Sequence, residues 1–232
     1  MSAQSVATKN GAAFQNARRV NQALTARLEK HALHWMAERA PLWVTSDKLT
    51  LLGLSAQIAA GVGYAFARYD RWWLLFVIVC LALNWLGDSL DGTLARVRHL
   101  ERPRFGFYVD HIVDIIGSVV LMCGLGASGL LHWQIAIAML VAFLILSGES
   151  YLATYTLGSF ELSQGIFGPT EIRVLLVLGN VAALRNPYST IFGHKLLLFD
   201  LGGAIAALAM GAMALAVTMR HTAQLYRQEP LP

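Results

Sequence analysis

The chain has 232 residues, of which 56% are hydrophobic and only 14% are charged, and its mean hydropathy is +0.52. An ordinary soluble domain carries about 25% charged residues, so this composition excludes one and predicts a polytopic membrane protein. The net charge is a modest +4, and we expect membrane lipids and no nucleic acid as partners.

The first segments of the chain are polar and then amphipathic. Residues 1–10 lack the apolar core of a signal peptide and are predicted to be disordered. Residues 11–40 predict a helix, with apolar positions at three- and four-residue steps: Phe14, Ala17, Val20, Leu24, Leu28 and Trp35. Basic residues at the other positions favour a juxtamembrane helix lying on the membrane surface. The alternative is a solvent-facing helix packed on the same protein.

Six apolar segments follow, each close to the ~20 residues that cross ~30 Å of hydrocarbon. Their predicted limits are 48–68, 72–97, 105–127, 132–156, 168–185 and 196–219. We therefore expect an all-α fold with a six-helix membrane domain over residues 45–220 and a cytoplasmic tail over residues 221–232.

The basic residues predict how the chain is oriented. Most Lys and Arg residues fall on the side of the N-terminus, and the opposite side holds only Arg68, Arg71, Arg185 and Lys195. By the positive-inside rule, both termini and the loop between the second and third spans face the cytoplasm. We expect an integral protein of a bacterial inner membrane.

Four carboxylates interrupt the second and third spans: Asp88, Asp91, Asp110 and Asp114. A charge at membrane depth is costly and is usually kept for function. Each pair is spaced to share a helix face, and folding the two antiparallel spans about residue 101 brings all four to one depth near the cytoplasmic boundary. Such carboxylates repel one another unless they are protonated or neutralised, so one or two hard divalent ions are expected there.

Gly92, Ala95 and Arg96 follow the first aspartate pair. Small residues on a helix face let a backbone or a flat ligand approach closely, and an arginine is a bidentate partner for phosphate. Metal, arginine and a spare carboxylate are the parts that a phosphoryl transfer needs. The expected active site therefore faces the cytoplasm.

The arrangement Asp88-x-x-Asp91-Gly92-x-x-Ala95-Arg96, followed by Gly106-x-x-x-Asp110-x-x-x-Asp114, resembles the signature of the CDP-alcohol phosphotransferases. These are six-helix membrane enzymes of phospholipid synthesis and are usually dimeric, so the resemblance implies a homodimer. The spacer 97–105 is one residue longer than the family pattern, and a loop between helices tolerates such an insertion.

The resemblance also implies roles for these residues. Asp88, Asp91 and Asp110 would hold Mg²⁺ or Mn²⁺, with Asp114 at the same site as the base that deprotonates the acceptor alcohol. Gly92 and Ala95 would admit the cytidine of a CDP-linked donor, and Arg96 would support its phosphates or the carboxylates. In-line attack on the donor would release CMP.

Several polar residues have less certain roles. His111 is a second candidate base or a polar residue at the rim of the site. Glu171 and Arg173 in the fifth span, like Glu149 in the fourth, either contact the acceptor or pair across helices. The run from Thr45 to Thr50 resembles the family's Thr-Pro-Asn-x-x-Thr stretch, with Ser46 and Asp47 replacing Pro and Asn, and it predicts a helix N-cap.

Two alternatives stay open for the substrates, and one for the class. The donor is CDP-diacylglycerol with a small alcohol acceptor, which we favour, or a CDP-linked choline or ethanolamine with diacylglycerol as acceptor. The second resembles this chain at Asp110-His111-x-x-Asp114 and between Tyr155 and Glu171, but such enzymes are usually longer. A cation or proton transporter also uses intramembrane carboxylates, yet it would not need Gly92, Ala95 and Arg96 at these offsets.

Overall fold

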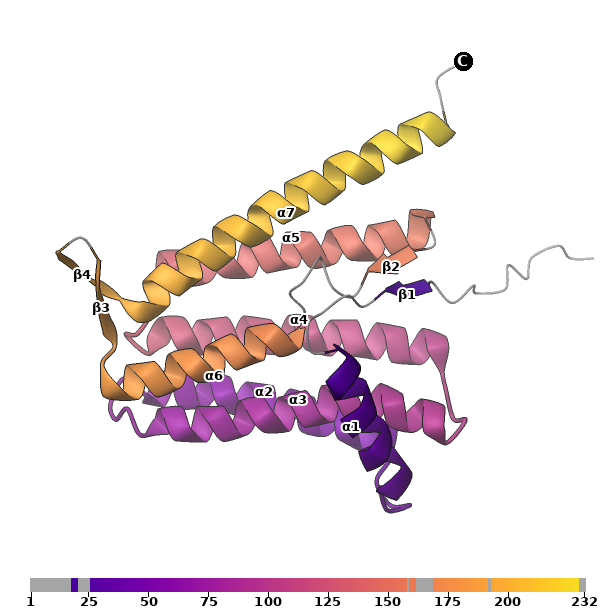
Figure 1. The fold of residues 1–232 in the computed structure, drawn as a ribbon, viewed down its shortest axis with the longest axis horizontal. Helices are drawn as coiled ribbons and strands as arrows, with labels where there is room; N and C mark the ends of the chain where they lie inside the picture. The colour runs from indigo at the N-terminus through magenta and orange to yellow at the C-terminus, as the bar shows by residue number, and fades with distance from the viewer. Residues whose placement is uncertain (1–17, 21–25, 158, 162–168, 192, 230–232) are drawn as a thin grey trace, which may run out of the picture.

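The computed structural model describes residues 18–20, 26–157, 159–161, 169–191 and 193–229 (Figure 1). Within them the helices are α1 (Ala26–Arg39), α2 (Ser46–Phe66), α3 (Trp73–Val97), α4 (Pro103–Ala127), α5 (Trp133–Leu157), α6 (Pro169–Arg185) and α7 (Leu198–Gln228). Two pairs of short strands accompany them: β1 (Arg18–Val20) parallel with β2 (Ser159–Glu161), and β3 (Tyr188–Ile191) antiparallel with β4 (His194–Leu197). The predicted all-α membrane fold is confirmed.

The number of spans differs from the prediction by one. Helices α2 to α7 follow the six predicted segments, but five of the described helices are long and apolar enough to cross a membrane. The exception is α6, whose 17 residues measure about 25 Å at the helical rise, short of the ~30 Å hydrocarbon layer. Prolines explain its length, because Pro169 begins the helix and Pro187 follows its end.

The ends of the chain also depart from the prediction. Helix α1 begins at Ala26, and the expected helix from residue 11 is wrong at Arg18–Val20, which pair with β2 instead. Residues 1–17 and 21–25 of the predicted segments lie outside the described residues. At the other end, α7 continues to Gln228, because no Gly or Pro occurs between Gly211 and Pro230 to stop it. Much of the predicted tail is therefore helical.

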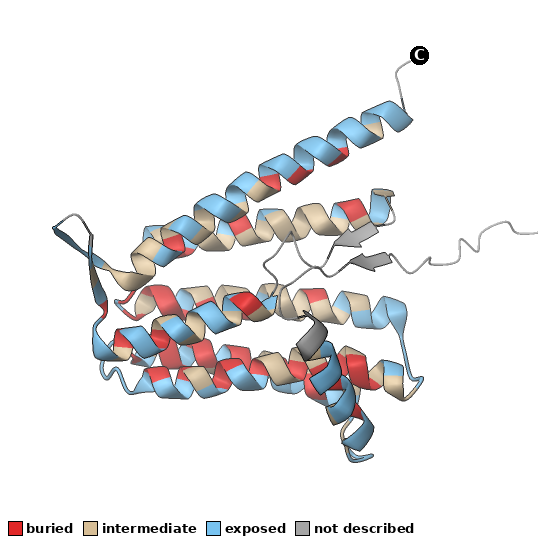
Figure 2. Cartoon of the chain, viewed as in Figure 1, coloured by how far each residue is buried: buried red, intermediate tan, exposed pale blue. Residues whose placement is uncertain are grey.

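Helix α2 lies at the centre of the most buried part of the molecule. It packs against both α3 and α4, and burial is concentrated in these three helices, whereas α5 and α7 pack on each other and have few buried residues (Figure 2). The contact with α3 is closest at Gly87, where an added Cβ would lie 2.6 Å from the Leu49 carbonyl oxygen and the Gly53 nitrogen. Glycine at this position therefore lets the two backbones meet directly beside Asp88.

Helix α1 crosses the C-terminal half of α3 (Figure 1). Its side chains Leu33 and Ala37 are buried against Leu90 and Leu94 of α3. Its opposite face carries Trp35, which is 54% exposed. The helix is thus amphipathic and docked on the bundle, as the alternative interpretation has it, and its exposed face is available to the membrane surface.

Candidate active site

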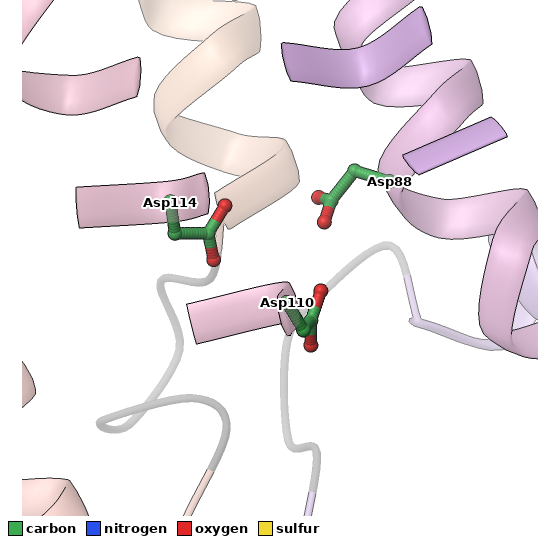
Figure 3. A group of neighbouring side chains, drawn as sticks. All are labelled: Asp88, Asp110 and Asp114. Carbon is green, nitrogen blue, oxygen red and sulfur yellow. The ribbon is translucent and has the colours of Figure 1, made fainter. Parts of the chain in front are cut away.

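Three carboxylates from two helices point toward one another (Figure 3). Asp88 comes from α3, and Asp110 and Asp114 come from α4, one helical turn apart. One oxygen atom from each can be chosen so that all three lie within 4.8 Å of one another. Hard divalent cations prefer carboxylate oxygens as ligands, so this group can hold a metal ion.

Helix α2 completes the site. The cavity at the carboxylates is lined by residues of three helices: Thr50, Gly53 and Gln57 of α2, Asn84, Asp88 and Asp91 of α3, and Asp110 and Asp114 of α4. Because α2 packs against both α3 and α4, it forms a wall between the helices that carry the acids. The site is therefore a three-helix cavity rather than the simple two-helix hairpin that the sequence suggests.

Asp91 lines the same cavity but is held differently from the other three carboxylates. Thr50 Oγ1 of α2 donates to its Oδ2 at 2.5 Å, and the Gly92 backbone nitrogen donates to its Oδ1 at 2.5 Å. Ser46 Oγ donates to the Asp91 carbonyl oxygen at 3.0 Å. The Asp91 carboxylate is thus fixed by neutral donors on α2 and α3, and it does not belong to the group of three.

Arg173 reaches the carboxylates from α6. Its Nη2 donates to Asp88 Oδ2 at 2.6 Å, and its Nε donates to Asn84 Oδ1 at 2.8 Å. Asn84 in turn donates to the Gly53 carbonyl oxygen at 3.0 Å, so the chain of contacts extends to α2. The Arg173 side chain is 13% exposed, and its Nη1 is buried with no hydrogen-bond partner among the described residues. Arg173 therefore pairs across helices and keeps one donor available.

The residues Gly92, Ala95 and Arg96 lie about one turn further along α3, outside the lining of the cavity. Arg96 Nη2 donates to Thr93 Oγ1 at 3.0 Å, and a Cβ added at Gly92 would lie 3.5 Å from Arg96 Nη1. The Arg96 side chain is thus folded back along its own helix over Gly92.

The remaining candidates are not part of the carboxylate group. His111 is buried and packs on Phe107 and Tyr151, with ring centroids 4.1 and 4.7 Å apart. Glu171 is buried on the first turn of α6. Glu149 of α5 instead pairs with His221 of α7, with Oε1 and Nδ1 2.5 Å apart. Glu149 therefore pairs across helices.

Two polar residues of the cavity that contact its charged groups, Thr50 and Asn84, were not among the candidate site residues. Thr45 is the N-cap of α2 and accepts from the Lys48 nitrogen, as predicted, but the same stretch also delivers Thr50 to Asp91. Thr50 could have been found because it matches the last threonine of the family's Thr-Pro-Asn-x-x-Thr stretch. Asn84 could have been found as a polar residue one turn before Asp88 in an otherwise apolar segment.

A polytopic helical bundle with a carboxylate cluster and an adjoining arginine fits a membrane enzyme that handles a phosphate-containing group. A model of the CDP-alcohol phosphatidyltransferase family matches residues 43–220, and the chain belongs to this family. It is therefore a phosphotransferase of phospholipid synthesis that moves a substituted phosphate from a CDP-linked donor to an alcohol.

Two similar proteins extend this comparison. An uncharacterized protein of Aquifex aeolicus is 31% identical over 144 residues, which cover 60% of this chain and 68% of that protein. The crystal structure of Mycobacterium tuberculosis phosphatidylinositol phosphate synthase (PgsA1) with CDP-DAG bound is 19% identical. The match covers 86% of this chain and 92% of that one, with a TM-score of 0.52. At this identity the likeness establishes a shared fold.

We predict that Thr50→Val lowers the rate of CMP release at least tenfold. Valine preserves the shape of threonine but removes the hydroxyl that donates to the buried Asp91, and a hydrogen bond to a charged group contributes about 1.5–3 kcal/mol. The measurement is CMP release by purified protein in detergent. Thr50→Ser keeps the donor and should retain most of the rate, and equal rates for the Val and native proteins would contradict the role of this contact.

Proposed function

We propose that the protein transfers the phosphatidyl group of CDP-diacylglycerol to an alcohol in the cavity between α2, α3 and α4. The acceptor oxygen forms a bond to the phosphorus next to diacylglycerol, the bond from that phosphorus to the CMP oxygen breaks, and CMP leaves. The observation that carries the proposal is the group of three carboxylates beside a buried guanidinium with a free N–H. Together they match a pyrophosphate that arrives with a cation.

Asp88, Asp110 and Asp114 are the residues proposed to hold one or two Mg²⁺ or Mn²⁺ ions, and Asp91 is proposed as a further ligand. Their oxygen-only donor set fits these hard ions. A bound ion neutralises charge on the pyrophosphate and on the leaving CMP. Asp91 lines the same cavity, and its oxygens can still bind an ion while they accept from Thr50 and the Gly92 nitrogen.

The arginines and small residues are proposed to bind the donor. Arg173 Nη1 is positioned to donate to a phosphate oxygen while Nη2 keeps its contact with Asp88. Arg96 is proposed to swing from Thr93 to the phosphates, which would uncover Gly92 and Ala95 for the flat cytosine ring. Glu171, buried on the same first turn of α6 as Arg173, stays a candidate contact for the acceptor.

Asp114 is proposed as the base that takes the proton from the acceptor hydroxyl. Asp114 lies one turn beyond Asp110 on α4, further from the loop between α3 and α4. It is next to Asp88, whose carboxylate is already paired with Arg173. His111 remains the second candidate, although its ring packs between Phe107 and Tyr151. Its Nδ1 lies 3.6 Å from Asp110 Oδ2, so the imidazole is already beside one of the three carboxylates.

CDP-diacylglycerol is favoured as donor because the Mycobacterium tuberculosis protein of the same fold has CDP-DAG bound. We further propose that the cavity faces the cytoplasm of a bacterium, and that two copies form a homodimer that covers part of the exposed faces of α5 and α7.

The test of this proposal is to offer purified protein each class of donor. We expect CMP release and a new phosphatidyl product with CDP-diacylglycerol and a panel of small alcohols, and none with CDP-choline or CDP-ethanolamine and diacylglycerol. Mass spectrometry of the extracted lipids identifies the product. Phosphatidylcholine or phosphatidylethanolamine formed from the amino-alcohol donors would reverse the assignment of donor and acceptor.

Asp114→Asn should stop transfer while leaving donor binding within about threefold of native, because Asp88, Asp91 and Asp110 remain to hold the ion. The amide cannot accept the proton, and loss of a positioned base costs about 10²- to 10⁴-fold. Calorimetry with the CDP-linked donor measures binding, and CMP release measures transfer. Asp70→Asn, which removes the same charge at the opposite end of the bundle, is the matched control. Loss of donor affinity in Asp114→Asn would assign Asp114 to binding instead.

Chelation should abolish turnover reversibly. With ethylenediaminetetraacetate in excess, the carboxylates lose the cation that neutralises them and the pyrophosphate, and added Mg²⁺ or Mn²⁺ should restore CMP release. Donor binding should be measured at the same chelator concentrations. This measurement shows whether the chelator prevents the donor from binding or only stops the transfer step. Turnover that is indifferent to the chelator would exclude a bound divalent ion from the reaction.

A further inference from the structure

Glu29 of α1 is an acidic residue in a stripe that is otherwise apolar. It precedes Leu33 and Ala37 at four-residue steps, and both of those side chains are buried against α3. A carboxylate on such a face is costly unless it is hydrogen-bonded. Its contacts therefore indicate why this position is acidic.

The Glu29 carboxylate joins three helices through a single oxygen. Its Oε1 accepts from Trp85 Nε1 at 2.9 Å and from Ser89 Oγ at 3.0 Å, both on α3. It also accepts from Thr170 Oγ1 at 3.0 Å, on the first turn of α6. The surface helix thus holds the start of α6 against α3.

These contacts run alongside those of the candidate active site. Asn84 and Asp88 are four residues apart on α3 and form one row along the helix. Trp85 and Ser89, each one residue later, form the adjacent row. Arg173 occupies the first row and Glu29 the second. On α6, Thr170 and Arg173 are three residues apart and share a face, so whatever fixes Thr170 also limits where Arg173 can lie.

We infer that Glu29 is a positioning residue, which holds the first turn of α6 so that the Arg173 guanidinium faces Asp88. It touches neither the cavity nor the carboxylates, and acts through Thr170 and the backbone of α6. The inference rests on the proposed role of Arg173 and Asp88 in donor binding. A surface helix that looks like a membrane anchor is therefore also part of the support for the site.

The kinetic test is Glu29→Ala, with CMP release expressed per folded protein. We expect kcat/KM for the donor to fall about tenfold, chiefly through a higher KM, because small displacements of a positioned group cost much of its effect. Glu29→Gln, which keeps an accepting oxygen, should recover most of the loss. Glu38→Ala is the control, since it removes the same charge from an exposed site on α1, where Glu38 forms ion pairs with His34 and Arg39 of the same helix.

Thr170→Val removes one donor of the same contact without removing a charge, and it tests the inference if Glu29→Ala fails to fold. We expect it to raise the donor KM in the same direction, and we expect the double variant to be no worse than Glu29→Ala alone. Native kinetics in folded Glu29→Ala, or full additivity of the two substitutions, would overturn the inference.

A second measurement is independent of the donor. Spin labels at the exposed positions Val79 of α3 and Leu175 of α6, in protein whose two cysteines are replaced by alanine, report the distance between these helices. Glu29→Ala should broaden or shift this distance distribution, and Glu38→Ala should not. An unchanged distribution in Glu29→Ala would overturn the inference even if the proposed donor proves wrong, whereas a shifted one would support it in either case.

Discussion

The fold is constrained above all by the convergence of like charges in a medium of low dielectric. Asp88, Asp110 and Asp114 lie close enough together to share one ion, and Asp91 lines the same cavity. Carboxylates brought together in this way repel one another strongly. The rest of the structure supplies the compensation: Arg173 contributes a positive charge to Asp88, and Thr50 with the Gly92 nitrogen satisfies Asp91. A divalent cation at these three carboxylates would reduce the repulsion further.

This compensation requires that three helices approach one another closely, and the glycines make that possible. At Gly87 the backbones of α2 and α3 meet with no room for a Cβ, which places Asp88 beside the wall formed by α2. Asn84, one turn earlier, then bridges the Gly53 carbonyl oxygen and Arg173. The close packing at Gly87 therefore makes the polar contacts of Asn84 possible. Both are ways in which membrane helices associate, through small residues and through interhelical hydrogen bonds.

The sequence could predict the helices and the aspartates, but not the contacts between distant segments. Hydropathy located α2 to α7 because crossing a membrane requires long apolar runs, and helical spacing indicated that Asp110 and Asp114 share a face. Neither the insertion of α2 between α3 and α4 nor the pairing of Arg173 with Asp88 leaves a periodic signal, because each joins residues far apart in the chain. The strand at Arg18–Val20 likewise depends on a partner found only in three dimensions.

The shortness of α6 has a physical explanation in the same terms. A helix spanning the whole bilayer would carry its N-terminus past the carboxylates to the interface, but α6 begins at Pro169, at the level of Asp88 and Ser89. The N-terminus of a helix carries a partial positive charge, and Arg173 adds a full charge on the next turn, where its side chain reaches Asp88. Glu29 keeps the first turn in place from the outside. By hydropathy alone, α6 is too short to be a complete span. Its short length nevertheless places the positive charge of Arg173 at the depth of the carboxylates.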